Sequence, residues 1–185
     1  QRLQKMIEDL FEYTKVSYGE LKLIMEKINL GELLEQLAEE FIPVLEEAGM
    51  KHNLLIPGEK VFVLGDGNML ARALENLITN AIRYGREGKR VDILLEVKDT
   101  NAAVKIINYG NPIPQADLPY IFERFYRVDK ARSRESGGSG LGLSIVQSSV
   151  EAMGGSIEVK DNPGGGSIFV LKLRTTDHEK EGDEE

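Results

Sequence analysis

A run of glycines at the start of a predicted helix is the first stretch whose residue types suggest chemistry. Residues 137–146 read Gly-Gly-Ser-Gly-Leu-Gly-Leu-Ser-Ile-Val, and apolar residues then recur at helical spacing as far as Met153. A helix that begins in a glycine-rich turn offers unpaired backbone N–H groups and the positive end of its dipole to an anion. The run therefore predicts a phosphate site, with a flexible hinge before an ordinary helix as the alternative.

Two common nucleotide-binding patterns do not fit this run. The Walker pattern ends in Lys followed by Ser or Thr, and no such pair follows these glycines. In a G-x-G-x-x-G pattern that starts at Gly138, Leu143 stands where the last glycine should be. A phosphate site here would belong to a different nucleotide-binding fold.

A second set of polar side chains shares one face of a predicted helix that Asp66 caps and that runs to about Tyr84. Asn76, Asn80 and Arg83 are spaced i, i+4, i+7, so they project together beside the apolar stripe of the helix. Asparagine is a mediocre helix former, and two of them beside a core need polar partners. The pattern indicates either a satisfied buried hydrogen-bond network or a site in which amide oxygens bind Mg²⁺ and the guanidinium pairs with a phosphate.

The elements that would position these side chains follow from hydrophobic spacing. The predicted helices are 1–17, the stretch from the Asn29 cap to Gly49, 66–84, a short one from Asp117 into 122–127, and the helix after Gly140. The predicted strands are 21–28, 52–56, 61–64, 91–98, 102–108, 156–160 and 167–174. The loop 128–139 is polar and basic, and it is either a lid able to close over an anion or ordinary surface.

Composition limits the class of protein. The 185 residues have room for one domain and an appendage, and the 41% of hydrophobic residues can build a core. No stretch approaches the roughly 18–20 apolar residues of a membrane span, and zero cysteines exclude disulfides and thiol catalysis. The formal charge is −8, but residues 175–185 hold six acidic residues and one lysine, which leaves −3 on the rest. A nearly neutral body with an acidic tail argues against nucleic acid as a partner.

In this order, the stretches resemble the catalytic ATP-binding domain of sensor histidine kinases, whose superfamily also includes gyrase B, a heat-shock chaperone and mismatch-repair ATPases. The match covers about residues 21–174, and its local texture is similar to vancomycin-resistance-type sensor kinases. Residues 76–84 resemble the N box, 108–113 stand in the place of the first glycine box, 122–127 in that of the F box and 138–142 in that of the second glycine box, and 164–167 resemble the third.

The resemblance implies a fold and a ligand. The fold is an α/β sandwich in which helices cover one side of a mixed sheet, and ATP with Mg²⁺ lies between the helices and a lid. Asn80 would ligate the metal, and Asn76 would help to hold the metal and the phosphates. Arg83, which stands where the family usually has Lys, would contact the terminal phosphates, as would Arg127 and Arg132 from the lid.

The resemblance also implies the remaining nucleotide contacts. The residues that would wrap the phosphates are Gly138, Gly140, Leu141 and Gly142. The residues that would surround the rest of the nucleotide, chiefly its base, are Tyr84, Asn108, Gly110, Ile113 and Ser167. Hydrolytic relatives carry a general-base Glu at the position of Asn76, and an amide cannot deprotonate water. The asparagine therefore fits transfer of phosphate to a protein side chain.

The first glycine box departs from the family pattern Asp-x-Gly-x-Gly. Asn108 replaces the adenine-reading Asp, and Pro112 replaces the second Gly. An asparagine carbonyl can still accept from the adenine amino group, but the loss of charge assistance costs on the order of 1 kcal/mol. We expect weaker binding and looser discrimination against guanine, because a flipped amide can donate.

A phosphoacceptor histidine is the second feature of the family that is missing. In the family it sits on an upstream helix, and neither His52 nor His178 has that setting. The chain is therefore expected to bind ATP without phosphorylating itself. Residues 1–20 are interpreted as the end of the second helix of the dimerisation hairpin, 21–174 as the catalytic domain and 175–185 as an acidic tail.

The predicted function is that of a protein-histidine kinase domain, which transfers the γ-phosphoryl group of ATP to an upstream histidine and thence to a response-regulator aspartate. The implied partners are the kinase's own dimerisation helices, in a homodimer, and the receiver domain of a response regulator. No nucleic acid partner and no membrane contact are expected for this stretch, which would be the cytoplasmic domain of an inner- or plasma-membrane sensor. Two alternatives remain: a serine kinase of the anti-sigma-factor type, and a nucleotide-sensing module with weak kinase output.

Overall fold

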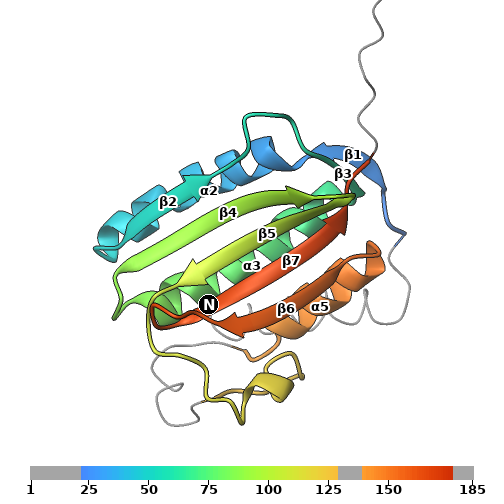
Figure 1. The fold of residues 1–185 in the computed structure, drawn as a ribbon. Helices are drawn as coiled ribbons and strands as arrows, with labels where there is room; N and C mark the ends of the chain where they lie inside the picture. Colours follow the sequence, from blue (N-terminus) through green and yellow to red (C-terminus); the bar gives the residue numbers. More distant parts are fainter. Residues whose placement is uncertain (1–21, 129–138, 177–185) are drawn as a thin grey trace, which may run out of the picture.

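A five-stranded sheet with helices on one face forms the body of the protein in a computed structural model, which describes residues 22–128 and 139–176. Figure 1 shows α2, α3 and α5 behind the sheet, with its other face toward the viewer. The helices are α2 (Leu30–Glu47), α3 (Gly67–Gly85), the 3₁₀ turn η1 (Leu118–Tyr120) and α5 (Gly142–Ala152). The strands are β1 (Glu26–Asn29), β2 (Lys51–Leu55), β3 (Phe62–Gly65), β4 (Arg90–Lys98), β5 (Asn101–Asn108), β6 (Ser156–Asp161) and β7 (Ser167–Arg174).

The sheet is mixed, as predicted. Its strand order is β2-β4-β5-β7-β6, in which β2 runs parallel to β4 and every other pair is antiparallel. A separate two-stranded ribbon pairs β1 with β3. The expectation of a mixed sheet with helices on one side is therefore confirmed.

The core lies between the sheet and the helices. Successive residues of a strand point to opposite faces, and alternate residues of the central strands, such as Val91, Ile93 and Leu95, are buried on the helix side. The predicted apolar stripe of α3 faces them, and its members are at most 2% exposed: Leu70, Ala73, Leu74, Leu77 and Ala81. Burial of this stripe fixes which face of α3 is left for polar residues.

Caps set the helix boundaries much as the sequence predicts. The Asn29 side chain accepts from the Glu32 N–H at the start of α2, and Gly49 after its end has a φ of 63°, which glycine adopts without strain. The Asp66 carboxylate caps α3 by accepting from the Met69 N–H at 3.0 Å.

Two predicted elements are shorter than expected. The strand predicted over 21–28 begins only at Glu26, because the Ile24 N–H donates to the Asp66 carboxylate at 3.0 Å. The helix predicted from Asp117 is the single turn η1, and the stretch 122–127 is not helical. Phe125 has a φ of 62°, and its N–H donates to the Gly140 carbonyl instead of to a helical turn.

Several predictions fall outside the described residues. These are the whole of the proposed 1–20 segment with its predicted helix, the loop residues 129–138, and the tail from residue 177. Among the helices that the structure describes, none has the length and apolarity needed to cross a membrane.

Asp66 allows a test of the caps. Its buried carboxylate holds both the start of α3 and the backbone before β1, through the two bonds given above. We expect Asp66→Ala to lower the free energy of unfolding by about 1–2 kcal/mol, which is a fall of about 2–4 °C in Tm per kcal/mol for a chain of this size. Asp66→Asn keeps an acceptor and should lose less. Urea unfolding measures both, and equal losses for the two variants would contradict the capping role.

Candidate functional site

The asparagine face of α3 and the glycine turn before α5 meet in the folded chain. A Cβ atom built on Gly142 would lie 3.4 Å from the Asn76 Oδ1 atom, an ordinary contact distance. α3 and α5 lie next to each other on the same face of the sheet (Figure 1). Two stretches that are far apart in sequence, each predicted to bind phosphate or metal, are thus brought to one place.

The two asparagines on this face are available to a ligand. Asn76 and Asn80 are half-buried, and neither side-chain amide has a hydrogen bond to the residues that the structure describes. The alternative of a satisfied internal network is therefore not seen within 22–128 and 139–176. Half-buried amides without protein partners are suited to accept a ligand's donors or to coordinate a hard cation such as Mg²⁺.

The start of α5 supplies backbone donors. Among the described residues no side chain caps this helix, so its first N–H groups are not used by a cap there. Leu141 is 1% exposed and packs on Ile145, and its own N–H donates to the Ser139 Oγ atom at 3.2 Å. The leucine side chain is therefore buried in this packing, and the uncapped N–H groups at the start of α5 remain for an anion.

Gly140 is a glycine for a packing reason. Its φ is 75°, and a Cβ atom there would lie 2.9 Å from the Cα atom of Phe125. The absence of a side chain therefore lets the stretch 122–127 lie against this turn. The structure gives no sign that the bare face of Gly140 is turned toward a ligand, whereas that of Gly142 is turned toward Asn76.

Asn108 lies at the other end of the site, beneath the C-terminal end of α3. It is 3% exposed, and its Cβ atom would be 3.1 Å from a side chain placed on Gly85. Its Oδ1 atom accepts from the N–H of the buried Ser167 at 3.0 Å. Two of the residues assigned to the base end, Asn108 and Ser167, are therefore hydrogen-bonded to each other.

Bare glycines surround the backbone at residues 108–110. A Cβ atom on Gly110 would overlap the carbonyl oxygen of Tyr84, one on Gly88 would overlap that of Tyr109, and one on Gly166 would overlap that of Asn108. Sequence reasoning missed Gly85 and Gly88, because glycines at the end of a helix look like an ordinary cap. Their closeness to the first glycine box is visible only in the folded chain.

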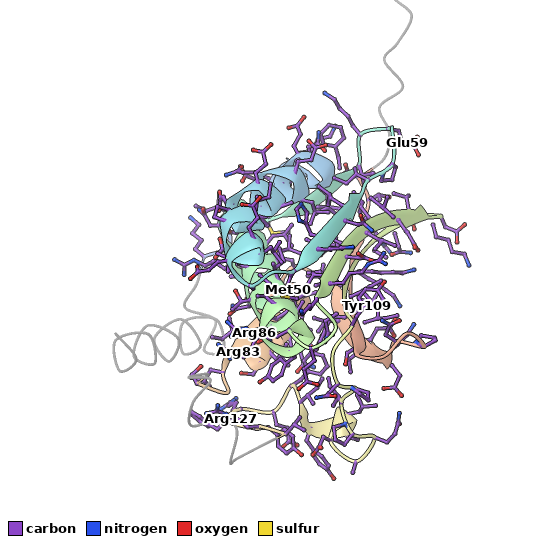
Figure 2. The ribbon with its side chains drawn as sticks, turned by 90° about the vertical axis from the view of Figure 1, so that its left-hand side faces the viewer. Met50, Glu59, Arg83, Arg86, Tyr109 and Arg127 are labelled. Atoms are coloured by element: carbon purple, nitrogen blue, oxygen red, sulfur yellow. The ribbon has the colours of Figure 1, made fainter. Side chains whose placement is uncertain are left out.

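The two predicted cationic residues that the structure describes, Arg83 and Arg127, lie on one side of the molecule. Arg83 and the exposed Arg86 are at the C-terminal end of α3, and Arg127 lies on the same side (Figure 2). Tyr84 points away from the interior and is 57% exposed. Arg132 and Gly138 lie outside the described residues, so their relation to this site stays a prediction.

The remaining site features concern support and metal binding. Ile113 is half-buried and packs on the core. The Tyr126 hydroxyl donates to the Asp117 carboxylate, which raises the pKa of Tyr126 to about 12 and keeps the phenol neutral at physiological pH.

No group of three or more His, Asp or Glu side chains that could hold a metal occurs among the described residues. A metal here would need the asparagine oxygens and those of a phosphate.

A two-layer α/β sandwich in which an asparagine side chain of one helix lies beside the uncapped, glycine-rich start of another is a domain suited to bind a phosphate-bearing ligand. Comparison with known proteins gives this class its family. A model of histidine kinase-, DNA gyrase B- and HSP90-like ATPases matches residues 65–177. The chain belongs to this family, and it is an ATP-binding domain of the sensor histidine kinase type.

Curated relatives support the histidine kinase branch. The sensor histidine kinase CusS of Escherichia coli K12 is 36% identical over 172 residues, which are 93% of this chain and 35% of CusS. The sensor protein VanS of Enterococcus faecium is 35% identical over 161 residues, which are 87% of this chain and 41% of VanS. The chain thus spans well under half the length of these relatives.

Solved structures show the same fold. The Acinetobacter baumannii histidine kinase AdeS is 28% identical with a TM-score of 0.75, and the match covers 95% of this chain and 79% of AdeS. Histidine kinase ThkA in complex with the response regulator protein TrrA is 25% identical with a TM-score of 0.77, over 95% of this chain and 48% of ThkA.

Gly110 allows a test of the packing around the site. Gly110→Ala would force a methyl group into the Tyr84 carbonyl, and we expect a loss of about 1–3 kcal/mol in the free energy of unfolding. Gly58 has nothing within 4 Å of the same position, so Gly58→Ala is the matched control and should stay within about 0.5 kcal/mol of wild type. Thermal unfolding measures both, and similar values for the two variants would contradict the close approach.

Proposed function

We propose that this chain is the catalytic domain of a two-component sensor kinase, which transfers the γ-phosphoryl group of ATP to a histidine on an upstream helix and from there to a response-regulator aspartate. The observation that carries the proposal is the approach of Asn76 to the glycine start of α5, with Asn80 one turn further along α3 and neither amide hydrogen-bonded to another described residue. Phosphoryl transfer needs chiefly positioning and charge neutralisation. The described residues are of the types that provide both.

In this proposal each part of the site has one task. Asn80 ligates Mg²⁺, which neutralises phosphate charge when bound. Asn76, one turn earlier in α3, holds phosphate and metal. The backbone from Gly140 to Gly142 wraps the phosphates, and Gly138 extends this turn. Arg83 pairs with the terminal phosphates from α3, and Arg127 and Arg132 do so from the lid side. Because Asn76 is an amide, the site has no general base there to activate water.

The base end is assigned to the first and third glycine boxes. Asn108 reads the base, and its Oδ1 atom accepts from the Ser167 N–H, so the flip of the amide that would favour guanine has to break this hydrogen bond. Gly110 lets this turn approach α3, Ile113 supports it from the core, and Tyr84 packs beside the nucleotide. The buried, hydrogen-bonded pair of Asn108 and Ser167 supports this assignment, since well-placed polar groups in a binding site can orient a ligand.

The proposed partners are the dimerisation helices of a homodimeric sensor protein and a response-regulator receiver domain. The ThkA relative was solved with such a regulator, which supports the second partner. Residues 1–20 are proposed to end the dimerisation hairpin, 21–174 to form the catalytic domain and 175–185 to be an acidic tail. The sensor relatives support a place for this domain on the cytoplasmic side of a membrane sensor.

Ligand binding by the isolated chain tests the site. A non-hydrolysable ATP analogue with Mg²⁺ should raise Tm, because a ligand of the folded state stabilises it. Removal of Mg²⁺ or the change Asn80→Ala should weaken binding about tenfold or more, and tenfold equals about 1.4 kcal/mol. Asn68→Ala is the control, since Asn68 is an exposed asparagine in the first turn of the same helix. An equal effect of both variants would remove Asn80 from the metal site.

Phosphotransfer is tested with a separately produced helical hairpin that carries a phosphoacceptor histidine. With labelled ATP, the chain should place acid-labile label on the hairpin and none on itself. Acid-stable label on serine would favour the serine kinase. Retained nucleotide binding without any label would favour a nucleotide-sensing module, an alternative that the changes at Asn108 and Pro112 motivate.

Base selectivity is tested at Asn108. Asn108→Asp keeps an oxygen for the Ser167 N–H and restores charge assistance to the base contact. We expect about fivefold tighter ATP binding, from about 1 kcal/mol, and a larger ratio of ATP to GTP affinity. Wild-type discrimination against GTP beyond about a hundredfold, or 2.7 kcal/mol, would show that Asn108 does not loosen selectivity.

A further inference from the structure

A charged cluster lies on the face of the sheet that carries no helices, directly behind the base end of the site. Asp92 is 5% exposed, and its carboxylate accepts two hydrogen bonds from Arg90, at 2.9 and 2.8 Å. The Tyr109 hydroxyl donates to the same carboxylate at 2.6 Å. We call these three residues the β4 clamp.

The ring of Tyr109 has two further contacts. The Arg90 guanidinium lies 4.8 Å from the centre of the ring, a cation–π distance. The ring edge lies 3.5 Å from a Cβ atom built on Gly164, in the loop before β7. Tyr109 therefore connects strand β4 to the first and third glycine boxes at once.

The position of the clamp keeps it from touching a nucleotide. Val91 and Ile93 point into the core beneath the helices, so Arg90 and Asp92 point to the other face of the sheet. Asn108 is buried beneath α3, whereas the side chain of Tyr109, the next residue, points toward Asp92 on the other face of the sheet. Figure 2 shows Tyr109 on the side of the molecule away from Arg83, Arg86 and Arg127.

The protonation states of Tyr109 and Arg90 in the clamp do not change near neutral pH. The hydrogen bond to Asp92, then burial and the carboxylate charge, raise the pKa of the Tyr109 phenol above its ordinary value. The same carboxylate raises the pKa of Arg90. Tyr109 therefore stays a hydrogen-bond donor, and Arg90 stays charged, throughout the physiological range.

We propose that the β4 clamp is a positioning device for the base end of the nucleotide site, in which Asp92 and Arg90 hold Tyr109 and thereby fix Asn108 and Gly110 in the geometry that binds the base. This inference rests on the proposed function. Because the carbonyls of Asn108 and Tyr109 already pack on bare glycines, small movements of the Tyr109 side chain pass directly into this backbone.

The test compares two ligands in the complete 185-residue chain. One is a non-hydrolysable MgATP analogue, and the other is magnesium tripolyphosphate, measured as a competitor, which has the phosphates without the base. Tyr109→Phe removes only the hydroxyl and keeps the ring beside Arg90. We expect it to weaken nucleotide binding about three- to tenfold and to leave tripolyphosphate binding unchanged, since only the base end should shift.

Asp92→Asn is the second variant, because it keeps an oxygen for the hydroxyl and loses the charge. It should show the same ligand-selective loss, and it replaces Tyr109→Phe should that variant not fold. Glu96→Gln is the matched control: Glu96 lies on the same strand and face, and it pairs with Lys105 at 2.6 Å, away from the glycine boxes. It should change neither affinity.

The outcomes separate the two hypotheses. A wild-type chain that binds no nucleotide overturns the proposed function and this inference with it. Wild-type binding with an unchanged nucleotide affinity in Tyr109→Phe and Asp92→Asn overturns the clamp alone. Equal weakening of both ligands also overturns it, because it shows a general structural defect and not a role in placing the base end.

Discussion

The close approach of the start of α5 to Asn76 on α3 is the constraint on which the site depends. It exists because the apolar stripe of α3 is buried against the sheet, which turns the asparagines sideways toward α5. The uncapped start of α5 then lies beside Asn76, and within 22–128 and 139–176 the amides of Asn76 and Asn80 have no hydrogen-bond partner. Each is costly to leave near a core without a partner. A phosphate-bearing ligand with a hard cation would satisfy both at once.

The described glycines of the first and second glycine boxes are of two kinds, with different physical reasons. Gly140 and Gly110 have no side chain because another segment's backbone lies there: that of Phe125 for the first and that of Tyr84 for the second. Gly142 has room for a side chain and instead faces the asparagine side of α3. A glycine box is therefore partly a packing device, which holds the segments that surround the nucleotide site, and only partly a surface for the ligand.

The two faces of the sheet have different tasks. The helix face carries the core and, at its end, the pair formed by Asn108 and Ser167. The other face carries charges, among which Asp92 gathers the hydrogen bonds of Arg90 and Tyr109. Because neighbouring residues of a strand point to opposite faces, a side chain on the outer face can set the backbone of a residue that points inward. Side chains on the outer face can therefore affect the backbone geometry of the site without lining it.

The sequence alone determined the helix and strand order, the Asp66 and Asn29 caps and the buried stripe of α3, since these follow from local spacing and short-range hydrogen bonds. It also determined the ordered motifs that resemble the family. Only the tertiary structure decided that β1 starts late, that residues 122–127 are not helical and that Gly88 packs on Tyr109. Those features depend on contacts between segments distant in the chain, such as Ile24 with Asp66 and Phe125 with Gly140, and no local pattern records them.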